Sequence, residues 1–428
     1  MLIRDPVHGD ISLSPLEQRV LDLAEMQRLR GIKQLGTASL VYPGCLHTRF
    51  DHSLGVNALS KRIVSAVRES GTPIGLELET AIGAAALLHD VTHVPFGHTL
   101  EDERCLFPRH DKGTRLLALL DGALGERLAE LGLKETVSAL LGVAAARASN
   151  VPPWARQVIS STIDADLLDY LRRDAYFAGL APNYDARIFS YFIVDGDQLV
   201  INMTKHGMER PDARSETVQL LRLRYFLTER VYYHHTKVAA GAMISKAVEL
   251  AHLHGALAED ELLKLNDWSL LRRLKSVPSP ERPDPRIVAL VERLERRVLL
   301  KRGYVVSALT VNEPERRELV ERFHHSTRNR SEAEQALARQ IGSDPAEVIV
   351  YCPALTVMKE AAALVRTPRG LLPLNASDDP SNTEIKAMEA RYAELWRFYV
   401  FVPEQFTART AEAAASMFGL PSEHEVRT

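Results

Sequence analysis

Apolar residues recur at helical intervals over much of the first two-thirds of the chain. In residues 15–33 they fall at steps of three and four, as in an amphipathic helix, and Ser14 followed by Pro15 is typical of a helix start. Residues 53–68 carry a second stripe. Within a third helix, predicted over 77–90, the part from 82 to 90 is apolar nearly all round, which predicts burial in the core. Further helical patterns cover residues 111–149, 155–178, 213–254 and 286–301.

Strand patterns are fewer and lie mostly late in the chain. Residues 191–203 alternate around Asp195-Gly196, a dipeptide typical of a two-residue hairpin turn. The prolines between 277 and 285 mark the best linker. Three more strands are predicted within residues 304–311, 347–351 and 398–402. Together the patterns predict a mainly α protein, with a helical body (1–275) that carries a small β-hairpin and a smaller α+β region (276–428).

The composition is that of an ordinary globular protein. Of 428 residues, 46% are hydrophobic and 25% are charged, and the formal net charge is −3. This charge gives no reason to expect a membrane or nucleic acid as partner, although a local basic groove would still allow nucleic acid. Cys45, Cys105 and Cys352 are too scattered for a disulfide framework or a zinc knuckle. Because no leader-like start or spanning apolar run is present, we expect a cytoplasmic protein.

Histidines gather in one part of the sequence. Of the 15 in the chain, those between positions 47 and 110 are His47, His52, His89, His93, His98 and His110. Histidine is the commonest metal ligand and the usual acid or base near neutral pH, so the clustering indicates a site. Surface histidines without a function would give the same count, and the count alone therefore does not decide.

His89 and Asp90 stand at the end of the predicted buried helix. An imidazole and a carboxylate suit a hard or borderline divalent metal ion. Neighbours on a helix point about 100° apart, so the pair can share one ion only at the helix end or in a wide coordination sphere. His52 and Asp166 are natural further ligands from other predicted helices. For the dipeptide alone, a helix cap with a mutual hydrogen bond would be the better explanation.

The order His52, His89-Asp90 and Asp166 resembles the signature of the HD-domain phosphohydrolase superfamily. The flanking sequence resembles one branch, the deoxynucleoside triphosphate (dNTP) triphosphohydrolases, which include the vertebrate sterile-alpha-motif/HD enzyme and bacterial dGTPase-like proteins. The resemblance runs in register from about residue 4 to about residue 250 and implies an HD-domain helical core. The segments that carry it are DPVHG (5–9), QRLRGIKQLG (27–36), HTRFDHSLG (47–55), HDVTHVPFGH (89–98), IDADLLDY (163–170) and VYYHH (231–235).

The resemblance implies a reaction and a cofactor. A dNTP would be hydrolysed at the α-phosphorus to a deoxynucleoside and inorganic tripolyphosphate. The four signature residues would hold a divalent ion (Mn, Mg, Fe, Co or Ni) that polarises a phosphate oxygen. The 5′-oxygen is a poor leaving group that needs a proton, and His98 matches the family residue beside it. His93 and His110 match active-site histidines that contact phosphate, and Glu101 stands where an aspartate pairs with a catalytic histidine.

Several substrate contacts are implied in the same way. Arg49 matches an arginine that grips the α-phosphate, for which a guanidinium fork is well shaped. Gln34 and Asp174 would hydrogen-bond the 3′-hydroxyl of the deoxyribose. Leu35 and Tyr232 would leave no room for a 2′-hydroxyl, so that ribonucleotides would be rejected.

Other positions face the sugar or the triphosphate, and two of them depart from the family pattern. Tyr170 matches a position beside the deoxyribose, and Arg224 and His234 match triphosphate-facing residues. Leu167 replaces a triphosphate-binding lysine, and His235 replaces another. Both changes remove positive charge, so either another residue compensates or the substrate has fewer phosphates.

The resemblance also implies regulation. Asp22, Gln27 and Arg30 match an allosteric site at which a nucleotide orders the active oligomer, so an activating nucleotide and a homo-oligomer (dimer or tetramer) are expected. The polar face of a core helix would explain the same residues. Two other functions stay open: a different HD phosphohydrolase activity, such as a nucleotidase or phosphodiesterase, and a nucleotide- or nucleic-acid-sensing regulator that uses basic segments such as 293–302.

Overall fold

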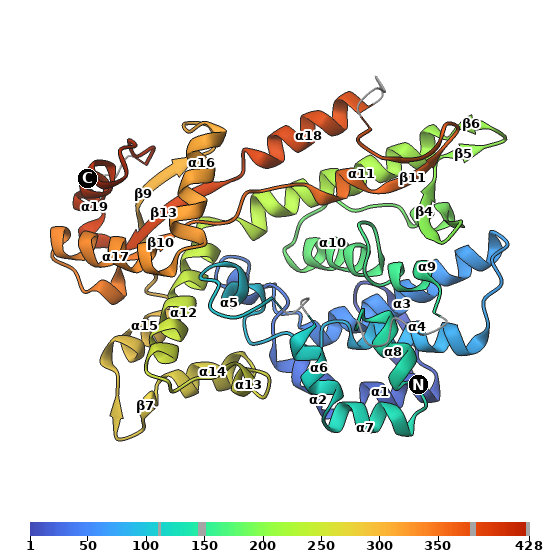
Figure 1. The fold of residues 1–428 in the computed structure, drawn as a ribbon, viewed down its shortest axis with the longest axis horizontal. Helices are drawn as coiled ribbons and strands as arrows, with labels where there is room; N and C mark the ends of the chain where they lie inside the picture. Colours follow the sequence, from blue (N-terminus) through green and yellow to red (C-terminus); the bar gives the residue numbers. More distant parts are fainter. Residues whose placement is uncertain (110–112, 144–150, 377–381, 425–428) are drawn as a thin grey trace.

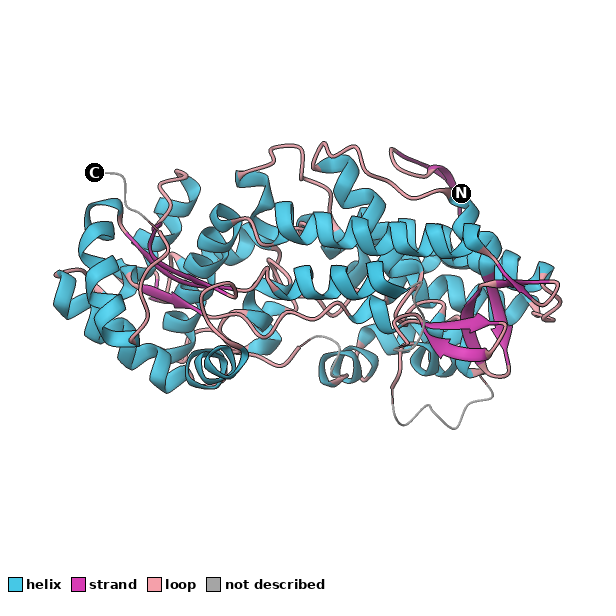
Figure 2. Ribbon diagram, turned by 90° about the horizontal axis from the view of Figure 1, so that it is seen from above, coloured by secondary structure: helices cyan, strands magenta, loops and turns pink. Residues whose placement is uncertain are grey.

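The computed structural model describes residues 1–109, 113–143, 151–376 and 382–424. The chain forms an elongated, mainly helical molecule with a small sheet towards each end (Figures 1 and 2), which confirms the predicted fold class. The helices up to residue 177 are α1 (Pro15–Leu21), α2 (Ala24–Arg28), α3 (Arg49–Glu69), α4 (Leu76–Leu88), α5 (His98–Asp102), α6 (Thr114–Leu120), α7 (Ala123–Glu130), α8 (Lys134–Leu140), α9 (Pro153–Gln157) and α10 (Ala165–Phe177). Those that follow are α11 (Pro211–Leu227), α12 (His235–Leu253), α13 (Glu259–Leu262), α14 (Asp267–Leu274), α15 (Pro285–Glu295), α16 (Glu313–Leu319), α17 (Thr327–Ile341), α18 (Thr383–Ala393) and α19 (Thr407–Phe418).

The strands are short and form five small sheets in the described part of the chain. They are β1 (Leu2–Asp5), β2 (Gly9–Ser12), β3 (Phe192–Asp195), β4 (Gln198–Asn202), β5 (Thr204–Lys205), β6 (Met208–Glu209), β7 (Pro278–Ser279), β8 (Arg282–Pro283), β9 (Lys301–Ser307), β10 (Ile349–Tyr351), β11 (Leu364–Thr367), β12 (Gly370–Pro373) and β13 (Arg397–Val402). The β3–β4 hairpin turns where Asp195 pairs with Gln198, as predicted. The predicted late strands correspond to β9, β10 and β13, which form one antiparallel sheet in the order β10-β13-β9.

The helix predicted over residues 15–33 is wrong as one element. The capping box between Ser14 and Glu17 starts α1, but α1 ends at Leu21. Leu23 then takes an extended conformation (φ −64°, ψ 144°), and the chain restarts as α2. The apolar spacing continues across this break because both short helices contribute buried residues to the same core: Val20 and Leu21 from α1, and Met26 from α2.

The segment from β11 to α18 returns to the N-terminal body. β11 pairs in parallel with β4 through Val365 and Ile201, and the four-stranded sheet has the order β12-β11-β4-β3. In Figure 1 this segment runs beside α11. Val365 and Ile385 are buried in the same apolar core as α3, α4 and α10. The proline-rich segment 277–285 forms the β7–β8 hairpin, and the boundary at residue 275 stays a prediction.

A buried ion network connects three distant segments. Arg104, just after α5, donates to Glu334 of α17 at 2.9 and 3.0 Å and to Glu249 of α12 at 2.6 Å. Lys246 donates to Glu334 at 2.6 Å. Burial opposes ionisation of Glu334, but the charges and hydrogen bonds of Arg104 and Lys246 together outweigh it and lower the pKa of Glu334 to about 2. No helix in the described ranges is long and apolar enough to cross a membrane.

We expect Arg104→Met to destabilise the fold by about 3–5 kcal/mol, because it leaves two buried carboxylates with too few positive partners. Arg104 is 2% exposed. Urea unfolding followed by circular dichroism would measure the loss. The control is Arg127→Met, which breaks an exposed pair with Glu130 and should leave the midpoint unchanged. Equal midpoints for Arg104→Met and the wild type would contradict a stabilising network.

Candidate metal and phosphate site

Three residues from different helices bring ligand atoms together. His52 lies in the first turn of α3, His89 follows the end of α4, and Asp166 lies in the first turn of α10. Their ligand atoms all lie within 4.8 Å of one another. The Nε2 of His52 is 2.9 Å from Oδ1 of Asp166 and 3.2 Å from Nε2 of His89. Two imidazoles and a carboxylate that converge in this way fit a divalent metal ion.

The outer nitrogen of each imidazole is held by another group. Nδ1 of His52 donates to Asp169 at 2.7 Å, and Nδ1 of His89 donates to the carbonyl of Ala86 at 2.8 Å. Both rings therefore direct Nε2 towards the shared position, as metal-ligating histidines do. Burial lowers the pKa of His52, but hydrogen bonds to Asp166 and Asp169 outweigh it and raise the pKa to about 10. A proton and a metal ion compete for this ring, so ion binding releases the proton.

Asp90 lies beside this group. Its Oδ1 is 3.5 Å from Nε2 of His89 and 3.1 Å from Nε2 of His93, and its Oδ2 accepts a hydrogen bond from Arg49 at 2.6 Å. Burial would raise the pKa of Asp90, but the positive charges of Arg49, His89 and His93 hold it well below its usual range. Asp90 is therefore ionised and close to the group, and its role as a fourth ligand stays a prediction.

Asp169 orients His52 from behind. Its carboxylate also pairs with His8 at 2.5 Å and accepts from Arg173 at 2.8 and 3.0 Å. Burial opposes ionisation, but the Arg173 guanidinium and the hydrogen bonds from His52 and His8 together outweigh it and hold the pKa of Asp169 well below its usual range. Gly55 makes room for this contact, because a Cβ there would lie 1.8 Å from the Asp169 carboxylate. The DPVHG and HTRFDHSLG segments therefore meet at one buried carboxylate.

The turn between α4 and α5, which carries His89 and His93, is held in place by side chains that are distant in the sequence. Arg28 of α2 donates to two of its carbonyls at 2.8 Å, including that of His93. Asp267 of α14 accepts from one of its backbone N–H groups at 2.8 Å. Gly97 has a φ of 57°, and a Cβ there would lie 2.5 Å from the Arg49 guanidinium. Glycine therefore lets the turn approach Arg49 closely.

The candidate acid and base residues lie next to this turn. His98 begins α5, and its side chain is 48% exposed. Its Nδ1 is 3.5 Å from Glu101, and its ring packs edge-to-face with that of His93 at 5.0 Å. Glu101 is buried and accepts a hydrogen bond from Arg115. His110 lies outside the described residues. An accessible imidazole oriented by a buried carboxylate can donate a proton to a bound substrate.

The residues predicted to surround a deoxyribose lie near Asp174 at the end of α10. Asp174 accepts a hydrogen bond from Tyr232 at 2.6 Å and pairs with His47 at 2.9 Å. The backbone N–H of Gln34 donates to the carbonyl of His47 at 3.0 Å. The side-chain oxygen of Gln34 is buried and has no hydrogen-bond partner among the described residues. Leu35 beside it is 8% exposed. A hydroxyl group of a ligand would satisfy the buried oxygen of Gln34.

Arg224 of α11 lies between two aromatic rings. Its guanidinium is 5.3 Å from the ring centroids of both Tyr170 and Tyr232, within the range of a cation–π contact. Its Nε is 3.3 Å from the carboxylate of Glu360. His234 instead caps α12 and stacks on the adjacent histidine at 4.6 Å, so its predicted contact with triphosphate finds no support in these interactions.

Two family models match the chain. The HD domain matches residues 49–174, a range that contains His52, His89, Asp90 and Asp166. The HD associated region matches residues 214–428. The chain belongs to the HD-domain phosphohydrolase superfamily.

Curated proteins resemble the chain over part of their length. An uncharacterised protein of Methanocaldococcus jannaschii is 30% identical over 318 residues, which cover 73% of this chain and 61% of that protein. An uncharacterised protein of Bacillus subtilis is 33% identical over 58% of this chain and 55% of its own length. A deoxynucleoside triphosphate triphosphohydrolase, SAMHD1 of Xenopus laevis, is 28% identical over 59% of this chain and 46% of its own. The chain thus spans about half the length of these relatives.

Solved structures share the fold over nearly the whole chain. A phosphohydrolase from Bacteroides thetaiotaomicron aligns with a TM-score of 0.70 at 24% identity and covers 94% of this chain and 100% of its own. A hypothetical protein from Aquifex aeolicus gives a TM-score of 0.69 at 21% identity, with 97% and 99% covered. The fold of nearly the whole chain therefore also occurs in these two structures.

Two of the three residues predicted for an allosteric site lie together on the surface of the HD protein. Gln27 accepts a hydrogen bond from Arg30 at 2.8 Å, and the Arg30 guanidinium lies 3.6 Å from the ring centroid of Phe50. Asp22 follows the last residue of α1 and is exposed. Phe50 follows Arg49 in the sequence, so Arg30 contacts the residue next to the arginine that pairs with Asp90. Its regulatory role stays a prediction.

Several supporting residues were not predicted. Four of them lie in the segments that carried the family resemblance, so their position in those segments was the available signal: His8, Arg28, His47 and Asp169. Asp267 and Arg115 lie outside those segments, and nothing in their local sequence marks them. Their contacts join residues more than ten positions apart, which a local pattern does not reveal.

We expect Asp169→Asn to weaken metal binding by about 10- to 100-fold, because the neutral amide orients His52 less firmly and no longer balances the charge of Arg173. His89→Ala and Asp90→Ala should lose the metal altogether. Metal content after dialysis against graded free Mn²⁺, measured by plasma mass spectrometry, tests all three. The control is Asp10→Asn, at an exposed aspartate of the β1–β2 hairpin, whose His8 pairs with Asp169. A stoichiometric metal in both alanine variants would refute the ligand set.

Proposed function

We propose that this protein is a metal-dependent hydrolase that converts dNTPs to deoxynucleoside and inorganic tripolyphosphate. The observation that carries the proposal is a stripe of three residues on α10: Asp166, Tyr170 and Asp174. They are spaced by four, so they share one face of the helix over about 12 Å. Asp166 belongs to the metal group, and Asp174 holds Tyr232. A nucleotide would place its phosphates at the Asp166 end of this stripe and its sugar at the Asp174 end.

The similarity to a vertebrate protein named as a deoxynucleoside triphosphate triphosphohydrolase supports the same substrate class. A bound divalent ion would supply Lewis acidity towards a phosphate oxygen and towards water. Arg49, which Asp90 holds at 2.6 Å, would bind an α-phosphate oxygen. His93 and His110 would add further phosphate contacts.

Bond cleavage needs a proton on the leaving oxygen. The oxygen of a water molecule would form a bond to the α-phosphorus and release a proton to the solvent, while the bond from phosphorus to the 5′-oxygen breaks. His98 would donate a proton to that 5′-oxygen, and Glu101, 3.5 Å from its Nδ1, would orient the ring. Gln34 and Asp174 would hydrogen-bond the 3′-hydroxyl of the deoxyribose, and Leu35 and Tyr232 would occupy the space that a 2′-hydroxyl needs.

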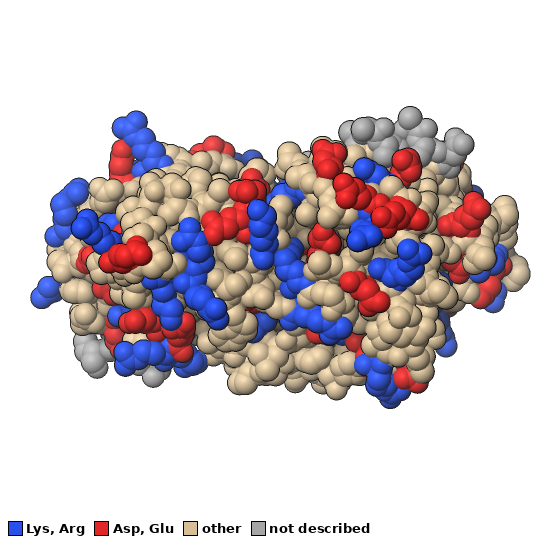
Figure 3. Space-filling model, turned by 90° about the horizontal axis from the view of Figure 1, so that it is seen from below, with Lys and Arg blue, Asp and Glu red and all other residues tan. Residues whose placement is uncertain are grey.

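An activating nucleotide at Asp22, Gln27 and Arg30 and assembly into a homo-oligomer form part of this proposal. Two alternatives compete with this proposal, and analysis of the phosphate products separates the first of them from the triphosphohydrolase. The loss of a lysine at Leu167 favours a nucleotidase or phosphodiesterase acting on fewer phosphates. A nucleic-acid sensor has weaker support, because Arg293 of the basic segment pairs with Glu347 at 3.3 Å. Figure 3 shows basic side chains in a band across one face, with acidic side chains close to it.

Incubation of the protein with Mn²⁺ and each of the four dNTPs should release tripolyphosphate and a deoxynucleoside in equal amounts from at least one of them. Anion-exchange chromatography separates tripolyphosphate from pyrophosphate and orthophosphate. His89→Ala is the control for contaminating phosphatases and should release none. Pyrophosphate or orthophosphate as the sole inorganic product would exclude the triphosphohydrolase and favour another HD phosphohydrolase activity.

The wild type should use dNTPs far better than NTPs, and Leu35→Ala should narrow the ratio of kcat/KM for the two substrates by about tenfold or more. Removing a buried side chain from a pocket changes discrimination by about 1–3 kcal/mol. Leu46→Ala, at an exposed leucine of the neighbouring segment, should leave the ratio unchanged. Equal kcat/KM for dNTPs and NTPs in the wild type would discard the roles given to Leu35 and Tyr232.

A further inference from the structure

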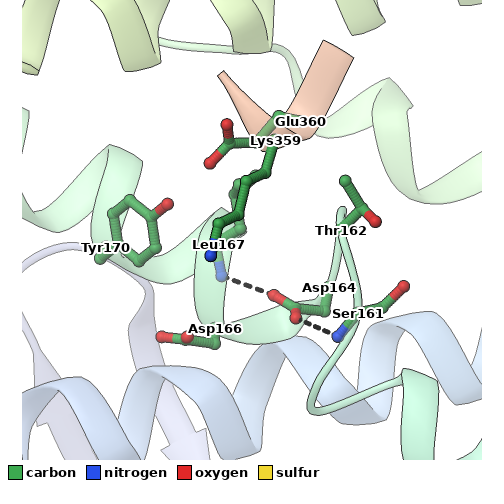
Figure 4. Close-up of a pocket in the computed structure, with 8 residues that line it drawn as sticks. All are labelled: Ser161, Thr162, Asp164, Asp166, Leu167, Tyr170, Lys359 and Glu360. Carbon is green, nitrogen blue, oxygen red and sulfur yellow. Dashed lines mark hydrogen bonds between the residues drawn. The ribbon is translucent and has the colours of Figure 1, made fainter. Parts of the chain in front are cut away.

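A cavity of about 160 Å³ opens beside the metal group. It is much larger than the space of about 30 Å³ that one water molecule takes in the liquid, so it has room for a phosphate group. Asp166, whose side chain is 39% exposed, belongs both to the metal group and to the cavity wall. The residues that line the cavity are Ser161, Thr162, Asp164, Asp166, Leu167, Tyr170, Lys359 and Glu360 (Figure 4).

The cavity is built from both family regions. Asp166, Leu167 and Tyr170 belong to the HD domain, whereas Lys359 and Glu360 belong to the HD associated region. The last two lie in a single turn of 3₁₀ helix, η9 (Lys359–Ala362), which precedes β11. In Figure 4 the Lys359 side chain extends from this turn towards α10. The pairing of β11 with β4 fixes the turn against the N-terminal body.

Most charged groups around the cavity are already paired. Asp164 caps α10 by accepting hydrogen bonds from the backbone N–H groups of Ser161 at 2.6 Å and Leu167 at 2.8 Å. Glu360 pairs with Arg224 at 3.3 Å. Lys359 is exposed and forms no hydrogen bond or ion pair within the described ranges. Its ammonium group is therefore available to a ligand.

A second lysine near the site is committed elsewhere. The ammonium group of Lys237 donates to the carbonyl of Tyr232 at 3.3 Å, and it faces the carboxylates of Glu103 and Asp174. Burial lowers the pKa of Lys237 and raises that of Glu103 to about 8. The ammonium group of Lys237 is therefore buried and faces two carboxylates, whereas the ammonium group of Lys359 is exposed.

We infer that Lys359 binds the terminal phosphates of the substrate in this cavity, an inference that rests on the proposed function for the identity of the substrate. The ammonium group takes the place of the cation that Leu167 lacks. The HD associated region thereby distinguishes a triphosphate from a nucleotide with fewer phosphates. Lys359 is a specificity-determining residue and takes no part in the cleavage of the bond.

The test is equilibrium dialysis of inorganic tripolyphosphate and of orthophosphate at fixed free Mn²⁺. Lys359→Gln should bind tripolyphosphate about tenfold more weakly, the loss expected of one charge-assisted hydrogen bond, and should bind orthophosphate as the wild type does. Lys359→Arg should keep the affinity. Leu167→Lys in the Lys359→Gln background should restore it, since position 167 lines the same cavity. Lys205→Gln, at an exposed lysine of β5, is the matched control.

Equal tripolyphosphate affinity in Lys359→Gln and the wild type would overturn the inference. The inference would also be overturned if Lys205→Gln lost as much tripolyphosphate affinity as Lys359→Gln. The same holds if Lys359→Gln lost as much affinity for orthophosphate as for tripolyphosphate, or if the wild type bound no tripolyphosphate. These binding measurements do not depend on turnover. If tripolyphosphate binding depends on Lys359 but no dNTP yields tripolyphosphate, the proposed function fails and the phosphate role of Lys359 stands.

Discussion

The buried carboxylate of Asp169 is the contact on which the geometry of the site depends. It receives hydrogen bonds from His52, His8 and Arg173, and Arg173 also donates to Asp5 at 2.8 Å. A buried charge without partners costs several kcal/mol, so these groups must come together when the chain folds. Asp5 in turn accepts from the backbone N–H of His8 at 2.7 Å, which shapes the β1–β2 turn. The N-terminal hairpin, α3 and α10 are therefore held in one arrangement, and that arrangement directs Nε2 of His52 towards its two partner ligands.

The C-terminal half is joined to the site by charge as well as by apolar packing. Arg104 follows the helix that begins at His98, and its partners Glu249 and Glu334 lie in α12 and α17. Because all three are buried, displacement of α17 would leave Arg104 short of a counter-charge close to the candidate acid. The near-neutral net charge of −3 hides this organisation, since buried positive and negative groups cancel in the sum. In the proposed function, Arg49 and Lys359 would supply positive charge to a bound phosphate chain.

Local patterns predicted many of the elements but not their long-range contacts. The hairpin around Asp195-Gly196 and the buried helix before His89 were predicted because periodicity and turn residues act over a few positions. The strands β11 and β12 were not predicted, since their stability comes from pairing with β4, about 160 residues earlier. The candidate metal ligands followed from a family signature whose order of residues the sequence resembles. Asp267, which fixes the turn after α4, could not be found in this way because its partner is 171 positions away.

The position of Lys359 changes what substrate binding requires of the fold. A lysine at position 167 would lie on α10 beside Asp166 and would need only the HD domain to be folded. Lys359 reaches the same cavity from η9, whose place depends on the pairing of β11 with β4 and on the burial of Val365. If a phosphate chain binds to Lys359, part of its binding free energy also stabilises this pairing, since a ligand stabilises the conformation to which it binds. Substrate binding and attachment of the HD associated region would then be thermodynamically linked. A change at the β4–β11 contact would alter phosphate affinity without touching a ligand-binding side chain.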